Sequence, residues 1–253
     1  GGMDVKYGIN QAFTLDMTLI PDFGQVQTDN RVLNLTPFDI RFNENRAFFT
    51  EGTELFNKGN LFYSRRIGLE PVYFSEMEVP DPANTNIIDY PFQADIINAT
   101  KISGRTQKGS GIGVLNAVTQ KQNATLKDSI SGKIYIQENL PLTNYNILVL
   151  DQTLKNNSSI SLVNTNVLRN GNAYDANVTS ALFDVNNKKN SWNVGGNVSF
   201  SNIISKEKTV TGYAHSIYFG KTSGRFNFNV WQDLANAKYD KSDLGYFTNN
   251  NTM

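Results

Sequence analysis

Most of the chain from residue 93 onward alternates between apolar and polar side chains with a period of two. In WNVGGNVSFS (residues 192–201), Trp192, Val198 and Phe200 share one phase, and Asn, Gly and Ser residues occupy the other. This period is that of a β-strand with one apolar and one polar face. The sequence therefore predicts an all-β, antiparallel fold. Further strands are expected near residues 96–107, 110–121, 130–137, 144–155, 158–169, 174–184, 209–219 and 224–231.

Residues 1–20 predict the first hairpin of this fold. In FTLDMTL (residues 13–19) every second residue is apolar, as in a half-buried strand. Pro21 then ends the ladder, because proline has no N–H to donate. We therefore divide the chain into a first hairpin (residues 1–20), an insertion (residues 21–92) and a long strand region (residues 93–253).

The insertion, residues 21–92, follows neither a helical nor a strand period. Its part FDIRFNENRAFFTEGTELFNKGNLFYSRRIG (residues 38–68) is dense in both aromatic and charged side chains, and a short helix with Thr50 as its N-cap is expected over residues 50–56. Prolines follow at positions 71, 80, 82 and 91. Because irregular loops of this length are uncommon inside compact domains, we interpret the segment as a functional insertion.

The charged residues of the insertion are its candidate functional site. Glycoside hydrolysis needs two carboxyl groups, one of them with a raised pKa. Carboxylates close to arginines are instead held ionised, which suits ion pairs better than a general acid. We therefore predict no catalytic residue and interpret the set as a plug held by Arg–carboxylate pairs, with ligand docking as a further role. The set consists of Arg41, Glu44, Arg46, Glu51, Glu54, Arg65 and Arg66.

The amino-acid composition argues against several other classes of function. The chain has 23 basic and 23 acidic residues, which gives no electrostatic case for binding nucleic acid. It has no cysteine and one histidine, so we predict neither a metal site nor a cofactor. No apolar run approaches the ~18 residues of a membrane helix. Barrel strands alternate in polarity, and this leaves a membrane β-barrel possible.

Two architectures share the strand pattern, a soluble sandwich or barrel and an outer-membrane β-barrel. The expected strands reach about 10 to 12 residues, against ~5–6 in ordinary soluble sheets. Their polar faces consist of Asn, Ser, Thr and Asp, as a water-filled lumen would need, and aromatic residues stand near the strand ends. These features favour part of a transmembrane outer-membrane barrel whose insertion plugs the lumen. The two ends of the sequence also suggest a piece of a longer polypeptide.

The run FNENRAFFTEG followed by LFYSRRIG, within residues 21–68, resembles a known family. The similarity continues through residues 101–121, 142–169 and 243–251. The family comprises Bacteroidota outer-membrane proteins whose C-terminal barrel is a domain of unknown function. In that family the barrel usually follows a family-9-type carbohydrate-binding module. The resemblance implies an outer-membrane location and no settled activity.

The leading hypothesis is a barrel in the cell outer membrane that binds or passes a surface solute without catalysis. The resemblance associates that solute with glycans. Expected partners are the lipid and lipopolysaccharide membrane, a glycan ligand and other envelope proteins, and nucleic acid is not among them. Two alternatives stay open. One is a glycan hydrolase that uses Glu44 or Glu51, and the other is a scaffold barrel that docks other envelope proteins.

Overall fold

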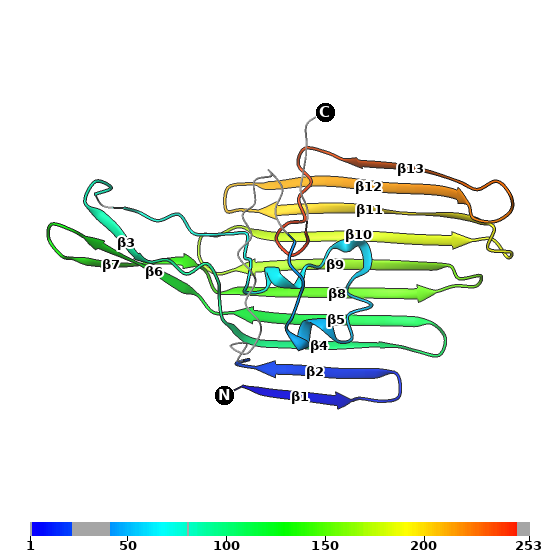
Figure 1. Ribbon diagram of the computed structural model, residues 1–253, viewed down its shortest axis with the longest axis horizontal. Coiled ribbons are helices and arrows are strands. Elements are labelled where there is room, and N and C mark those ends of the chain that lie inside the picture. Colours follow the sequence, from blue (N-terminus) through cyan, green and yellow to red (C-terminus); the bar gives the residue numbers. More distant parts are fainter. Residues whose placement is uncertain (1, 22–40, 80, 247–253) are drawn as a thin grey trace.

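The computed structural model describes residues 2–21, 41–79 and 81–246. Its main feature is a ten-stranded antiparallel sheet, whose strands lie side by side in Figure 1. In spatial order the strands are β1 (Met3–Gly8), β2 (Phe13–Leu19), β4 (Ile96–Arg105), β5 (Ser110–Thr119), β8 (Thr143–Thr153), β9 (Ser159–Arg169), β10 (Asp175–Asn186), β11 (Trp192–Ile204), β12 (Thr209–Lys221) and β13 (Phe228–Ala235).

A second sheet has three antiparallel strands, β3 (Thr85–Asp89), β6 (Gln122–Asp128) and β7 (Ile134–Leu140), in the order β3-β6-β7. It projects beyond one end of the large sheet (Figure 1). The pattern near residues 130–137 predicts a strand, and β7 confirms it. Strands β3 and β6 were not expected, because β3 is short and lies within the irregular insertion.

The all-β, antiparallel prediction is confirmed, but a closed barrel is not seen. Among the described residues, β1 pairs only with β2, and β13 pairs only with β12. The large sheet is therefore open at both edges in this part of the chain.

One face of the large sheet is covered by other segments, and we call it the covered face. The inserted segment, residues 41–79, crosses it with α1 (Ala47–Thr50) and the 3-10 turns η1 (Lys58–Asn60) and η2 (Ser64–Arg66). Residues 236–246 return to the same face, where Leu244 joins the hydrophobic core. The core combines segment residues Phe49, Leu55, Phe56, Leu61, Phe62 and Ile67 with sheet residues Ile96, Ala99, Leu115, Ala117, Tyr145, Ile147, Val149, Val163, Val167, Ala176 and Val178.

The glycine-rich run at residues 109–113 creates space for this packing. A Cβ on Gly111 would lie 3.1 Å from Leu55 Cδ2, and one on Gly113 would lie 3.1 Å from Phe56 Cε1. Side chains at these two positions of β5 would push the inserted segment off the sheet.

The short helix lies earlier than the sequence suggests, at residues 47–50 instead of 50–56. Thr50 ends it, and its hydroxyl donates back to the carbonyl of Ala47 at 3.1 Å. Within the described residues, no helix has the length and apolar character needed to cross a membrane.

The opposite face of the large sheet, which we call the bare face, presents a band of exposed aliphatic side chains. Leu150 and Leu162 are directly paired across β8 and β9 and are 42% and 43% exposed. Their neighbours in the other phase, Val149 and Val163, are fully buried on the covered face. Strands β8 and β9 therefore separate a packed face from a face whose aliphatic side chains no described residue covers.

A row of asparagines borders this aliphatic band. Asn116, Asn146, Asn166, Asn177 and Asn202 are paired neighbour to neighbour from β5 to β11. The sequence pattern suggests that such residues line a wetted lumen. These five asparagines lie instead on the bare face, because the covering segments pack on the opposite phase of β8 to β10.

Candidate functional site

The centre of the inserted segment is a buried ion pair between Arg46 and Glu44. The side chain of Arg46 is 1% exposed, and its Nη2 lies 2.6 Å from Glu44 Oε2. Arg46 Nη1 and Nη2 also donate to the carbonyls of Ile67 (2.7 Å) and Ser64 (2.9 Å). The Ser64 hydroxyl donates to Glu44 Oε2 at 2.6 Å. One arginine thus joins α1 to η2 and fixes the fold of the segment.

The pKa of Glu44 shows why this carboxyl is unsuited to donate a proton. Burial by itself would raise this pKa. Hydrogen bonds from Arg46, its positive charge and the hydrogen bond from Ser64 outweigh burial and bring the pKa below its ordinary value. Glu44 is therefore held as a carboxylate at neutral pH.

The other arginines of the predicted set serve the same segment. Arg65 Nε lies 2.6 Å from Glu70 Oε1, and Arg65 Nη1 donates to the carbonyl of Asn43 at 3.1 Å. Arg66 Nη1 donates to the carbonyl of Glu70 at 3.2 Å. Arg41 is exposed, and its guanidinium lies 5.6 Å from the Tyr63 ring centroid. These contacts place all four arginines around the chain reversal at η2.

Glu51 and Glu54 do not join this cluster. Glu51 forms an exposed ion pair of 2.9 Å with Lys6 on β1, and the hydrogen bond and charge of Lys6 lower the pKa of Glu51. Glu54 lies exposed on the surface of the segment. The structure thus gives Glu44 and Glu51 separate cationic partners that both favour ionised carboxylates, and the geometry does not favour the hydrolase alternative.

Charged groups on the strands anchor the inserted segment to the covered face. Asp151 on β8 lies 2.7 Å from Lys58 of η1 and 2.6 Å from Arg105 at the end of β4. Lys101 on β4 donates to the carbonyls of Phe48 and Glu51, both at 2.5 Å. The end of α1 thus provides the hydrogen-bond acceptors for the ammonium group of Lys101.

Sequence reasoning missed Asp151 and Lys101, although the pattern carried a signal for both. Each stands in the buried phase of its strand. Asp151 continues the series Ile147 and Val149, and Lys101 follows Ala99. A charged residue in an apolar phase is costly unless a partner lies opposite, so such positions indicate contacts with a second layer.

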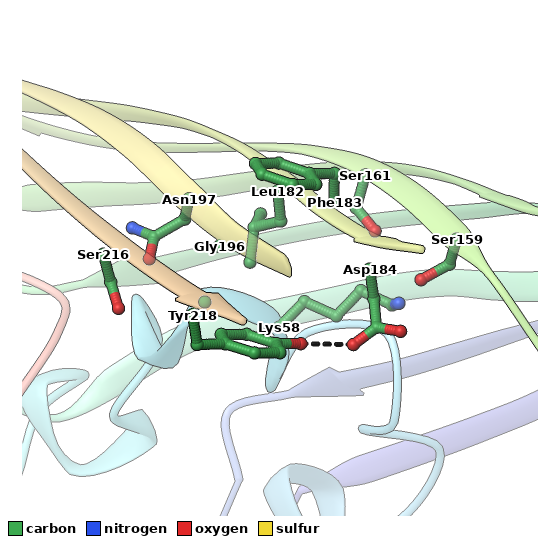
Figure 2. A pocket seen from close by; sticks show the side chains of 11 residues that line it. Lys58, Ser159, Ser161, Leu182, Phe183, Asp184, Gly196, Asn197, Ser216 and Tyr218 are labelled. Carbon is green, nitrogen blue, oxygen red and sulfur yellow. Dashed lines mark hydrogen bonds between the residues drawn. The ribbon is translucent and has the colours of Figure 1, made fainter. Parts of the chain in front are cut away.

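A small polar cleft lies beside the inserted segment, on the covered face of β9 to β12 (Figure 2). Its volume is about 230 Å³. Two adjacent rows of paired residues form its floor, and the η1 turn at Lys58 and Gly59 forms one side. The lining residues of the first row are Ser159, Asp184 and Tyr218, the last two joined through Gly195 in the strand pairing, and those of the second row are Ser161, Leu182, Asn197 and Ser216.

The charged groups of the cleft already have partners. The Tyr218 hydroxyl donates to Asp184 Oδ2, as Figure 2 shows. The amides of Asn186 and Asn193 donate to Asp184 Oδ1 at 2.8 and 3.0 Å. Lys58 is paired with Asp151. The cleft therefore carries no excess charge.

Other polar atoms of the cleft have no hydrogen-bond partner among the described residues. No described residue forms a hydrogen bond with the hydroxyls of Ser159 and Ser216 or with Asn197 Oδ1. These groups offer both donors and acceptors to a molecule that enters the cleft.

No group of three or more His, Cys, Asp or Glu residues in the described ranges has the arrangement of a metal site. The cleft offers hydroxyl and amide groups, one carboxylate and one ammonium group.

Taken together, these features define an open antiparallel sheet with an inserted segment anchored on one face. The chain belongs to the family described as Domain of unknown function (DUF5916), whose model matches residues 1–253. This confirms the expected membership of a family of unknown function. Comparisons with curated proteins and with solved structures find no match.

Proposed function

We propose that this chain forms the wall of an outer-membrane β-barrel that binds or passes a surface solute along its covered face. In this proposal the bare face contacts lipid. The inserted segment, residues 41–79, lies inside the barrel and narrows its lumen as a plug. The Arg46–Glu44 pair and the anchors at Lys101 and Asp151 hold the plug in place.

The aliphatic band on the bare face is the observation that carries this proposal. It extends along the row Ile112, Leu150, Leu162, Ala181 and Val198, from β5 to β11. The band also contains an apolar hollow of about 640 Å³ over these strands, which lipid chains would fill. Apolar faces of this extent mark interaction or membrane surfaces.

The two borders of the band fit the same proposal. The asparagine row lies along one border. At one end of β11 to β13, the exposed Trp192 and Phe219 and the half-buried Phe228 form an aromatic cluster, with 5.4 Å between the ring centroids of Trp192 and Phe219. Aromatic girdles next to an apolar band are typical of barrel walls at the membrane interface.

Closure is a requirement of this proposal. Lipid cannot satisfy unpaired backbone groups, so spanning sheets must have no free edges. The free edges of β1 and β13 would be paired in the membrane by further strands.

A charge placed in the middle of the band tests the proposal. We expect Leu162→Arg to destabilise the protein folded in lipid bilayers by ~2–4 kcal/mol, as arginine does near the bilayer midplane. The free energy of unfolding in phosphatidylcholine vesicles measures this effect.

Asn166→Arg is the matched control, because Asn166 lies on the same strand and the same face but in the bordering row. We expect a cost of about 0–1 kcal/mol there. If both variants change stability by less than about 0.5 kcal/mol, the bare face is an ordinary wetted surface and the proposal is wrong.

A further inference from the structure

The polar cleft beside η1 has the chemistry of a ligand site, and we propose that it binds a neutral, hydroxyl-rich solute the size of a single sugar unit. The inference rests on the proposed function in one respect, the access of surface solutes to the covered face. The site itself is argued from its own size, charge and hydrogen-bonding groups.

The size of the cleft limits the size of the solute that it can bind. The cleft has a volume of about 230 Å³. Pockets for drug-sized ligands begin at ~300 Å³. The cleft therefore admits one small ring or a short polyol.

Charge sets the second limit. The two charged side chains that line the cleft, Lys58 and Asp184, have opposite signs, and each is satisfied by protein groups. A charged solute would lose its hydration shell without gaining a free counter-charge. The cleft therefore favours a neutral solute over an anion or a cation.

The unpaired polar groups set the third limit. The Ser159 and Ser216 hydroxyls can each donate and accept, and Asn197 Oδ1 accepts. A sugar hydroxyl also donates and accepts, so each of these groups finds a match on it. Leu182 and the ring of Tyr218 add apolar surface for the C–H faces of such a solute (Figure 2).

Neighbouring residues hold this arrangement in shape. A Cβ on Gly195 would lie 2.3 Å from the Tyr218 hydroxyl oxygen, so the Tyr218 side chain occupies space that only glycine leaves open. The bond from Tyr218 to Asp184 then fixes its position. Tyr218 and Asp184 are therefore ordered before a solute arrives.

Saturation-transfer NMR on the 253-residue chain in detergent micelles tests the proposal, with D-glucose, D-galactose and sorbitol as probes. We expect at least one of these to bind saturably, and inorganic phosphate and putrescine not to compete. Ser216→Leu fills the cleft and should abolish binding. Asn197→Ala removes one acceptor and should weaken binding about fivefold, the effect of one neutral hydrogen bond.

Asn166→Ala on the bare face is the control and should bind as the unmodified chain does. Failure of all three probes to bind, or equal binding to Ser216→Leu, overturns the proposal. Preferential binding of phosphate or putrescine also overturns it. Asn197→Ala, a milder change, decides the matter if Ser216→Leu does not fold.

The two proposals fail separately. If Leu162→Arg does not destabilise the protein in bilayers but the sugar still binds, the membrane role is wrong and the ligand site stands. If Leu162→Arg destabilises the protein in bilayers as expected but no sugar binds, the ligand site is wrong and the barrel proposal stands.

Discussion

At the scale of single residues, the protein relies on buried charges that are fully paired. Arg46 is enclosed by Glu44, two backbone carbonyls and the ring of Phe49, whose centroid lies 4.3 Å from the guanidinium carbon. Removing one partner of such a pair leaves an uncompensated buried charge, which costs more than the pair itself contributes.

Glu44→Gln tests this pair and its pH dependence. We expect a loss of ~3–5 kcal/mol in the free energy of unfolding at pH 7, since Arg46 is left without its counter-charge. The pKa of Glu44 lies below its ordinary value of 4.5 in the folded protein. Its contribution is therefore complete above about pH 4.5 and is lost as the pH falls through the lower folded-state pKa.

Urea unfolding from pH 3 to pH 8 measures this dependence. The curves of the unmodified chain and of Glu44→Gln should converge only at the acid end. Glu51→Gln, which breaks an exposed pair with Lys6, should change little at any pH. A constant difference between the curves down to pH 3 would contradict the role given to Glu44.

At the scale of elements, the inserted segment owes its conformation to the sheet beneath it. Helix α1 has only four residues and no side-chain cap at its N-terminus, so it is too short to be stable alone. Its last carbonyls are satisfied by Lys101 of β4, which is 1% exposed. The strand thus completes the helix.

Lys101→Met tests whether this contact holds the segment. The change keeps the apolar stem but leaves the carbonyls of Phe48 and Glu51 without their donor, at ~1–3 kcal/mol for each buried group. We expect faster hydrogen exchange in residues 47–57 and unchanged protection in β8 and β9. Lys127→Met, on the exposed surface of β6, is the control. Equal protection of residues 47–57 in both variants would show that the segment is held by other contacts.

At the scale of the whole molecule, the two ends of the large sheet differ. Short turns at one end join β4 to β5, β8 to β9 and β10 to β11. The other end, where the small sheet projects (Figure 1), has the long connections from β2 to β4 and from β5 to β8 beside the short turns from β9 to β10 and from β11 to β12. Outer-membrane barrels have short periplasmic turns and longer extracellular loops. From the proposed function we therefore expect the small sheet to face the cell exterior.

Cysteine labelling tests this orientation, because the 253 residues contain no cysteine of their own that would react. Ser131→Cys lies between β6 and β7, and Lys189→Cys lies in the turn between β10 and β11. In intact cells, a membrane-impermeant maleimide should label the first variant and reach the second only after lysis. The opposite pattern would invert the orientation.

The sequence by itself determined the local features of this protein. Period-two alternation depends on neighbours along one strand, and it correctly predicted strands near residues 96–107, 144–155 and 158–169. It also predicted that arginines and carboxylates would pair within the insertion, because they lie close together in the sequence. It did not predict that Glu70, outside the chosen set, is the partner of Arg65.

Only the tertiary structure decided which face of each strand is covered. Alternation divides a strand into two faces without saying which one meets a second layer. In β10, Ala176 and Val178 belong to the core on the covered face, while Val185 in the opposite phase is exposed on the bare face. The cleft could likewise not be predicted from the sequence, because Lys58, Asp184 and Ser216 are brought together by strand pairing and by the packing of the inserted segment. Residues so far apart in the chain come together only through the register of four strands, which no local pattern specifies.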